Sequence, residues 1–345
     1  MKNSIFKKGL AVCLALIMVF AVTACGTASD TSSIPQVQKS ITLTDQAGRT
    51  VTLEKEAQTI VSCYYITTYA TMVLGISDRV IGLEKKADSR PIYHLAAPAL
   101  LEKPQVGTLK EFNVEATAAL KPDLVLMPKK LSNHADTLTE LGIPVLVVNP
   151  ESQELMEEML NLIAKACGVE EKAEKLISYY DSQLSHMAKL AKGSEPKSVY
   201  MAGNSSYLST APSGMYQSNL ISLAGGENAV QRLEGDYWIE VSYETIIAAN
   251  PQVIIIPCNA NYTAADILAD EHLKDVTAVK NKAVYQMPQK IEEWDSPIPS
   301  GVLGVMWLTS VLHEDKYPFS TFKNDVADYY STFYGFKIDT NLITK

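Results

Sequence analysis

VEATAALKPDLVLMP (residues 114–128) and YETIIAANPQVIIIP (residues 243–257) carry the same pattern, and this pattern decides the fold. Each stretch has a helical segment with a glutamate near its start, a proline that stops the helix, and an apolar run that a second proline closes. The matching residues, each pair 129 positions apart, are Glu115 and Glu244, Pro122 and Pro251, and Pro128 and Pro257. A helix followed by a buried strand, built twice at one spacing, predicts two related α/β halves.

Helical and strand patterns alternate on both sides of these stretches. An alternating pattern around a turn at 41–53 predicts a β-hairpin at the start of the folded body. The expected strands of the first half are 59–63, 79–83, 124–127 and 145–148, and those of the second half are 198–201, 253–256 and 283–287. Strands that take turns with helices predict a mostly parallel sheet in each half, covered by helices.

A long helix is expected between the two halves. Residues 169–192 contain no glycine or proline, and their apolar residues fall on one helical face. About 24 helical residues would make a rod of roughly 36 Å. We therefore expect an N-terminal α/β lobe at 40–168, a linking helix at 169–193 and a C-terminal α/β lobe at 194–345.

The first residues of the chain have the pattern of a secretion signal. Lys2, Lys7 and Lys8 precede an uncharged run at 9–24, which is short for a membrane-spanning helix of about 20 residues. The run ends in VTACG, which resembles the lipobox of bacterial lipoproteins, in which the cysteine becomes lipidated. The alternative is an ordinary signal peptide in which Cys25 is incidental.

The lipobox resemblance predicts a lipid-anchored protein outside the cytoplasm. It implies a signal peptide at 1–24, a lipid on Cys25, and a flexible tether that extends to residue 39. Loss of the signal peptide removes three lysines and no acids, so the formal charge of −9 becomes −9 − 3 = −12. This charge argues against nucleic acid as a partner.

The remaining cysteines do not indicate a disulfide framework or a zinc site. Cys63, Cys167 and Cys258 are odd in number, and no two of them have CxxC spacing. We expect buried, inert thiols, although Cys63 and Cys258 both follow predicted strands and could face a common cleft.

Taken together, several segments resemble the class III substrate-binding proteins of ABC importers, the family that binds ferric siderophores, haem and cobalamin. The segments are ITLTDQAGRTVTLEKEAQTIVS (41–62), NVEATAALKPDLVL (113–126), LAGGENAV (223–230), WIEVSYETIIAANPQVIII (238–256) and LKDVTAVKNKAVYQMP (273–288). The resemblance implies two α/β lobes joined by a single rigid helix, with the ligand held in the cleft between them. It also implies an ABC permease with its ATPase as partner, and a binding protein that works as a monomer.

The resemblance gives the repeated glutamates a role. In that family one glutamate on each lobe docks onto arginines of the permease, and Glu115 and Glu244 occupy the matching places. The alternative is that each is only an acidic residue at a helix start, where the helix dipole favours it by roughly 0.3–1 kcal/mol.

Candidate ligand-binding residues follow the predicted strands, because open α/β sheets place their sites at the carboxyl ends of strands. The candidates are Tyr64, Tyr65, Arg90, Tyr93, His94, Lys110, Tyr207, Tyr237, Trp238 and Trp294. Trp238 stands in the W-x-x-V-S-x-E pattern of the family, whose cobalamin-binding members pack a tryptophan there against the corrin ring. Trp294 lies in EEWDSP, where those members also carry an aromatic residue.

Aromatic residues and scarce basic residues together favour a large chelate as ligand. Tyrosine and tryptophan suit a flat or chelated molecule, so an iron–siderophore, haem or cobalamin-type ligand is preferred. The alternative is an oxoanion such as molybdate or tungstate. The basic candidates for an anion are Arg90, Lys110, Arg232, Lys129 and Lys130.

Two other questions about chemistry stay open at this point. Tyr93 and His94 could reach a metal centre of the ligand, although a lone histidine is more often a surface residue. An extracellular lipoprotein enzyme is the alternative of another class, but the sequence contains no GxSxG, HExxH or GxxxxGK[ST] motif. We expect no catalytic residue, and no cofactor besides the lipid on Cys25.

Overall fold

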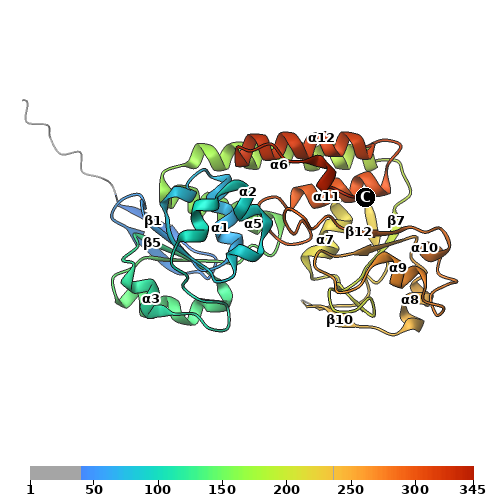
Figure 1. The fold of residues 1–345 in the computed structure, drawn as a ribbon, viewed down its shortest axis with the longest axis horizontal. Coiled ribbons are helices and arrows are strands. Elements are labelled where there is room, and N and C mark those ends of the chain that lie inside the picture. The colour runs from blue at the N-terminus through green and yellow to red at the C-terminus, as the bar shows by residue number, and fades with distance from the viewer. Residues whose placement is uncertain (1–39, 236) are drawn as a thin grey trace, which may run out of the picture. The chain divides into compact units, whose positions relative to one another are not determined.

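The computed structural model describes residues 40–235 and 237–345. The expected signal peptide, the lipidation site Cys25 and the tether lie outside the described residues. These described residues belong to one compact unit, which is coloured from blue to red in Figure 1. Within the described ranges, no helix has both the length and the apolar character needed to cross a membrane.

The N-terminal lobe is built on a sheet of four parallel strands in the order β4-β3-β5-β6. The strands are β3 (Ile60–Ser62), β4 (Val80–Leu83), β5 (Leu124–Pro128) and β6 (Val145–Val148), and the hairpin β1 (Ile41–Thr44) and β2 (Thr50–Leu53) precedes them. The C-terminal lobe has a second parallel sheet in the order β12-β11-β7-β9. Its strands are β7 (Lys197–Met201), β9 (Gly226–Asn228), β11 (Val253–Ile256) and β12 (Val284–Gln286).

The two sheets share one topology. In each, the first strand along the chain lies between the second and the third, and the fourth pairs with the third. The predicted strand repeat therefore occupies the same place twice, because β5 and β11 are the third strands of their lobes. A further short pair, β8 (Ser209–Thr210) and β10 (Ile239–Glu240), is antiparallel.

Helices connect and cover the strands of both sheets. They are α1 (Tyr65–Val73), α2 (Pro91–Ala96), α3 (Val114–Ala119), α4 (Ala135–Glu140), α5 (Gln153–Cys167), α6 (Glu170–Ala191), α7 (Tyr216–Leu223), α8 (Tyr243–Ala249), α9 (Ala264–Leu268), α10 (Thr277–Lys280), α11 (Val302–Leu312) and α12 (Phe319–Tyr329). A single π-helical turn continues α12 from Tyr330 to Tyr334. Helix α9 ends at Leu268, and Asp270 just beyond it accepts hydrogen bonds from Tyr207, Tyr243 and His272.

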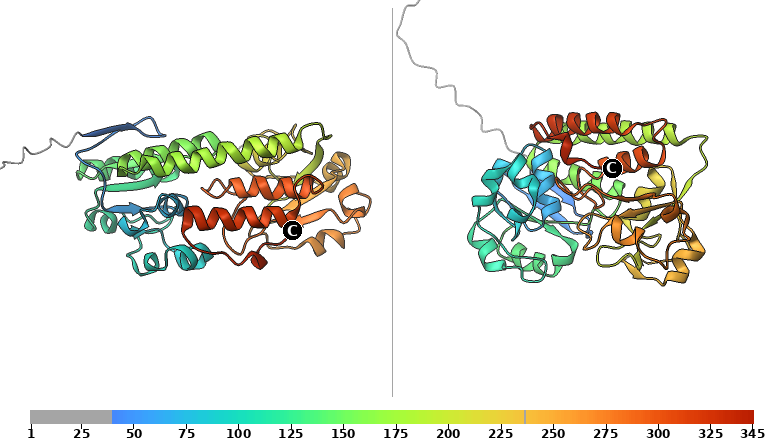
Figure 2. Two further views of the ribbon diagram at one scale, coloured as in Figure 1. Left: turned by 90° about the horizontal axis from the view of Figure 1, so that it is seen from above. Right: turned by 45° about the vertical axis from the view of Figure 1, so that its right-hand side comes forward.

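The 22-residue helix α6 extends along both lobes, as Figure 2 shows. It packs against α5 of the first lobe and against α7 and α11 of the second. Tyr180, near the middle of α6, donates a hydrogen bond to the carbonyl of Pro299, which also accepts one from Tyr329 of α12. Because α6 is unbroken over roughly 33 Å, it fixes the spacing between the two sheets.

Alternate side chains of the central strands serve two different cores. On β5, Leu124 and Leu126 belong to a large apolar cluster that continues through α6 and α11 into the second lobe, while Val125 and Met127 belong to a separate cluster of the N-terminal lobe. β11 divides in the same way: Val253 and Ile255 join the shared cluster, and its other two residues join one on the outer face of the second sheet. A two-residue period on a fully buried strand explains why these runs are apolar throughout.

The repeated stretches also share their helix ends. Asn113 caps α3 by accepting a hydrogen bond from the backbone of Ala116, and Ser242 caps α8 in the same way. At the other end, Lys121 and Asn250, again 129 positions apart, have left-handed backbones with φ of 50° and 41°. The turn before each proline is thus built twice, with a non-glycine residue in a conformation that costs roughly 1–2 kcal/mol.

Glycine at position 121 should relieve this cost. Glycine adopts positive φ freely, so Lys121→Gly is expected to raise the free energy of unfolding by up to about 1 kcal/mol in urea titrations. The matched control is Lys103→Gly, because Lys103 has an ordinary extended backbone with φ of −81°. There the same change should lower stability by roughly 0.5–1 kcal/mol, and equal losses at both positions would contradict the interpretation.

Candidate functional site

The carboxyl ends of the central strands of both sheets open onto one cleft. The loops after β3 and β5 come from the N-terminal lobe, and those after β7 and β11 come from the C-terminal lobe, which is where open parallel sheets place ligands. Three cavities of about 530, 660 and 190 Å³ lie in this region. They adjoin one another, because the smallest shares Tyr65 and Arg90 with the first and Gln217 and Trp238 with the second.

The wall formed by the N-terminal lobe is strongly basic. Lys85, Lys86, Arg90 and Lys110 surround the 530 Å³ cavity together with Tyr64 and Tyr65. Lys129 and Lys130 follow β5 at the edge of the 660 Å³ cavity. The chain as a whole is acidic, so this gathering of cations marks the cleft as a place that attracts anions.

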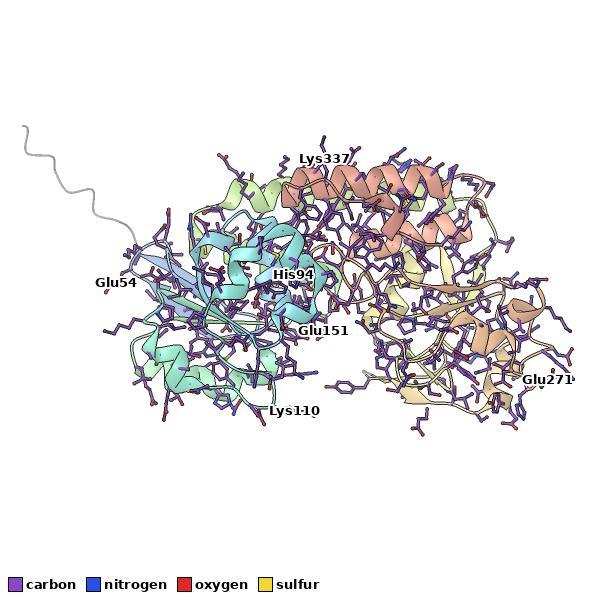
Figure 3. All side chains as sticks on the ribbon, in the orientation of Figure 1. Glu54, His94, Lys110, Glu151, Glu271 and Lys337 are labelled. Atoms are coloured by element: carbon purple, nitrogen blue, oxygen red, sulfur yellow. The ribbon has the colours of Figure 1, made fainter. Side chains whose placement is uncertain are left out.

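A tight loop presents Lys110 to the cavity. Gly107 has φ of 114°, and a side chain there would lie 2.1 Å from the carbonyl oxygen of Glu111. The hydroxyl of Thr108 accepts hydrogen bonds from the backbone of Lys110 and Glu111, which closes the turn. Lys110 and Glu151 lie where the N-terminal lobe faces its neighbour, as Figure 3 shows.

The wall formed by the C-terminal lobe is aromatic and polar. Trp238 is half-buried and borders the 660 and 190 Å³ cavities, while Tyr237 is 72% exposed. The ammonium group of Lys130 lies 5.9 Å from the centre of the Tyr237 ring and so reaches across the cleft. Asn204 and Gln217 add amide groups, and the side-chain oxygen of Gln217 is buried without a hydrogen-bond partner.

An ion pair crosses the cleft at its inner end. Nη1 of Arg90 lies 2.6 Å from Oε1 of Glu293, and both side chains are mostly buried. The guanidinium carbon of Arg90 is 3.7 Å from the centre of the Tyr65 ring. The hydroxyl of Tyr69 donates to the other carboxylate oxygen of Glu293 at 3.4 Å. One residue from each lobe thus takes part in an ion pair at the floor of the cleft.

The structure places six of the ten predicted ligand-binding residues on the cleft wall. They are Tyr64, Tyr65, Arg90, Lys110, Tyr237 and Trp238. Their contact with a ligand stays a prediction. Arg232, also considered for an anion, is exposed and does not line any of the three cavities.

Tyr93 and His94 do not come together at the cleft, and neither lines any of the three cavities. Adjacent residues of a helix point in different directions. Tyr93 is fully buried, and its hydroxyl donates to Glu84. Burial and the Glu84 carboxylate raise the pKa of this phenol well above its ordinary value, so it stays protonated. His94 is exposed, with Nε2 2.9 Å from the carbonyl of Asp88.

Tyr207 and Trp294 were also expected at the cleft, and both lie elsewhere. Trp294 is 0% exposed; its indole donates to the hydroxyl of Tyr330 and packs edge-on against Phe322. Tyr207 donates to Asp270 and packs against Tyr262 in the C-terminal lobe. Both positions follow strands, but Trp294 points into the lobe interior and Tyr207 is half-buried beside Asp270.

The cysteines are free and buried, and two of them border the cleft. Cys63 lines the 530 Å³ cavity and Cys258 the 190 Å³ cavity. Burial raises the pKa of both thiols, so they remain protonated and unreactive. In residues 40–235 and 237–345 no cluster of histidine, cysteine or acidic side chains could hold a metal ion.

Sequence reasoning missed Lys85, Lys86, Gln217 and Glu293. The two lysines directly follow β4, so the strand-end rule that selected Tyr64 and Arg90 could have found them. Glu293 had the same signal as its neighbour Trp294, but nothing in the sequence said which of the two faces the cleft.

Glu292, the neighbour of the cleft residue Glu293, is a buried acid. Its carboxylate accepts hydrogen bonds from Tyr330 and Tyr334, each at 2.6 Å, and its side chain is 1% exposed. Burial raises its pKa to about 7, and likewise raises that of Asp295 to about 6. Both therefore hold a proton in the folded protein at a pH where the unfolded chain has lost it.

Glu115 and Glu244 lie away from this cavity system, on the exposed first turns of α3 and α8. A hydrogen bond with Ser242 lowers the pKa of Glu244, which keeps this fully exposed carboxyl ionised. Both helices lie on the opposite side of their lobes from α6 (Figure 1).

Comparison with known proteins places this geometry among binding proteins. A model of the family described as periplasmic binding protein matches residues 60–291, which include strands of both sheets. The molybdate-binding protein MolA of Haemophilus influenzae is 26% identical over 320 residues, which cover 85% of this chain and 90% of that protein. YvrC of Bacillus subtilis, an uncharacterized ABC transporter substrate-binding lipoprotein, is 28% identical over 296 residues, covering 81% and 90%.

The fold has a counterpart among solved structures. A periplasmic solute binding protein from Veillonella parvula matches with a TM-score of 0.77 and 25% identity, over 88% of this chain and 95% of that one. This match confirms the two-lobed α/β fold predicted from the sequence.

Glu292 should make the stability of the protein depend on pH. A pKa raised from 4.5 to about 7 gives stability that is complete below pH 4.5 and is lost as the pH rises through 7. This change amounts to roughly 3 kcal/mol at 1.36 kcal/mol per unit. In Glu292→Gln the fall of the unfolding free energy between pH 5 and 8 should be much shallower, whereas Glu54→Gln, an exposed control, should keep the parent slope. An unchanged slope in Glu292→Gln would refute this assignment.

Proposed function

This chain belongs to the periplasmic binding protein family, the substrate-binding components of ABC importers, and from that premise we propose that it captures a metal chelate and delivers it to a membrane permease. The chelate is of the iron–siderophore, haem or cobalamin type, and a negatively charged ferric siderophore fits the cleft best. The proposal assigns binding and transport to the chain and no chemical reaction.

The observation that carries the ligand class is the pairing of a basic wall with an aromatic wall across a roomy cleft. Cavities of about 530 and 660 Å³ are of the size that encloses drug-sized molecules. Four cations at the first cavity and two at the second exceed what a neutral ligand needs. Tyr64, Tyr65 and Trp238 offer ring surfaces that a compact tetrahedral anion would leave unused.

An oxoanion such as molybdate is the second candidate, and one observation favours it. The relative that aligns over 85% of this chain is named as a molybdate-binding protein. A small anion could use Arg90 and the amide groups of Asn204 and Gln217 at the 190 Å³ cavity alone. Binding there would leave Trp238 with a minor role, which separates the two candidates by experiment.

The position of the protein in the cell forms a further part of the proposal. We place it outside the cytoplasm, anchored by a lipid on Cys25 after loss of residues 1–24, with residues 25–39 as tether. A relative named as a substrate-binding lipoprotein supports this placement. The folded part acts as a monomer, divided into lobes at 40–168 and 194–345 that the linking helix at 169–193 joins.

The proposed contact with the permease is made by Glu115 and Glu244. Both glutamates are exposed, occupy the second position of equivalent helices, and stand on different lobes. A permease with its ATPase that carries two basic patches would recognise the bound state through both lobes at once.

Removal of the Trp238 ring should distinguish a chelate from an oxoanion. Trp238→Ala is expected to weaken binding of a ferric tris-catecholate by roughly tenfold or more, because it removes a large buried contact area. Molybdate affinity should change by less than about threefold. Isothermal titration of both probes, after a thermal-shift screen that also contains haemin and cyanocobalamin, measures this. Tight binding of molybdate alone would replace the chelate with the oxoanion.

Charge reversal should separate ligand capture from delivery. The double variant Glu115→Arg/Glu244→Arg is expected to keep the parent affinity for its ligand but to abolish uptake into cells, because two permease contacts become repulsive. The control Glu54→Arg/Glu174→Arg reverses two exposed glutamates elsewhere and should transport normally. Normal uptake by the first variant would show that these glutamates are only helix-start residues.

A further inference from the structure

Arg90 and Glu293 form an ion pair with each other at the floor of the cleft. Arg90 begins the segment that leads into α2 of the N-terminal lobe, and Glu293 lies between β12 and α11 of the C-terminal lobe. Their charged atoms are 2.6 Å apart, and the side chains are 26% and 15% exposed. Both residues line the 190 Å³ cavity that joins the two larger ones.

The surroundings of Arg90 form a site for an anion. Among the described residues on the wall of the 190 Å³ cavity, Arg90 is the one cation and faces the acids Glu293 and Asp295. The Tyr65 ring covers one face of its guanidinium. Asn204, Gln217 and Asn259 supply further polar groups on the same wall. Within the described chain the position that an anion would take beside Arg90 is held by the carboxylate of Glu293.

We propose that Glu293 is a built-in counter-ion that an anionic ligand must displace from Arg90, and that it thereby determines which anions the cleft accepts. The inference rests on the proposed function only in naming the cleft as the ligand site. Glu293 lines the ligand site beside Arg90 and acts as a specificity-determining residue.

Displacement selects for multiply charged ligands. A monovalent anion that replaces Glu293 exchanges one carboxylate-type contact for another, and it also leaves the Glu293 charge half-buried and unpaired. A ligand with two or more negative charges gains additional attraction from Lys85, Lys86 and Lys110 in the adjoining cavity. A neutral ligand has nothing to offer Arg90, so it binds without breaking the pair.

Glu293→Gln tests this directly, because glutamine keeps the shape of the side chain and removes its charge. In isothermal titrations with sodium molybdate and with a ferric tris-catecholate, the variant should bind at least tenfold more tightly than the parent. Cyanocobalamin, a neutral probe, should bind equally to both. Glu271→Gln removes the same charge from the surface of the same lobe, where Glu271 pairs with Lys274, and should leave all affinities within twofold of the parent.

A double variant makes the outcome independent of the natural ligand. If Arg90 is the anion site that Glu293 occupies, Glu293→Gln should gain molybdate affinity even if the parent protein binds none of the probes. Arg90→Gln/Glu293→Gln should lose this gain. Failure of every probe with the parent would overturn the proposed ligand class, whereas failure of Glu293→Gln to gain anion affinity would overturn the counter-ion. A gain that persists in the double variant would overturn it as well.

Discussion

The unbroken helix α6 is the constraint on which the cleft depends. Two separate parallel sheets have no shared strand, so their distance is set by what packs along both of them. Tyr180 of α6 and Tyr329 of α12 both donate hydrogen bonds to the carbonyl of Pro299. They fix the segment after β12 to the helical layer, and this segment carries Glu293 to the side chain of Arg90. The cross-cleft pair therefore forms at a place that the linking helix determines.

Charge in the cleft is arranged against the charge of the whole molecule. The chain has 39 acidic and 30 basic residues, yet the wall of the N-terminal lobe collects lysines and Arg90. Glu84 lines the 530 Å³ cavity on this wall, but its carboxylate accepts hydrogen bonds from Thr68 and Tyr93, and burial raises its pKa. On the C-terminal lobe, the buried carboxylate of Glu292 accepts hydrogen bonds from Tyr330 and Tyr334. Glu151, Glu293 and Asp295 also line the cavities, so these three acids partly offset the cations that an anion would meet in the cleft.

The repeated stretches predicted the architecture because their information is local. Proline positions and apolar runs specify where a helix ends and a buried strand begins, and the equal spacing specified that this happens twice. The site was predicted less well, since a rule about strand ends selects loops but not the direction of side chains. In the irregular segment after β12, Glu292 and Trp294 are buried and Glu293 lines the cleft, so neighbouring residues have different surroundings. The partners that decide the direction, Tyr330 and Tyr334, are about 40 residues further along the chain.

The repeat also explains why the same edge of each sheet bears both the cleft loops and a glutamate that we propose contacts the permease. A helix that leads into a parallel strand runs in the opposite direction to that strand, so its first turn lies at the edge where the strands end. α3 precedes β5 and α8 precedes β11, which puts Glu115 and Glu244 on the side of the lobes toward which the cleft loops project. α6 covers the other side (Figure 1). A permease that grips both glutamates would consequently face the mouth of the cleft. Because each glutamate stands on its own lobe, the distance between the two contacts depends on how closely the lobes approach each other. The unbroken helix α6 limits that approach, so it also sets the distance between Glu115 and Glu244.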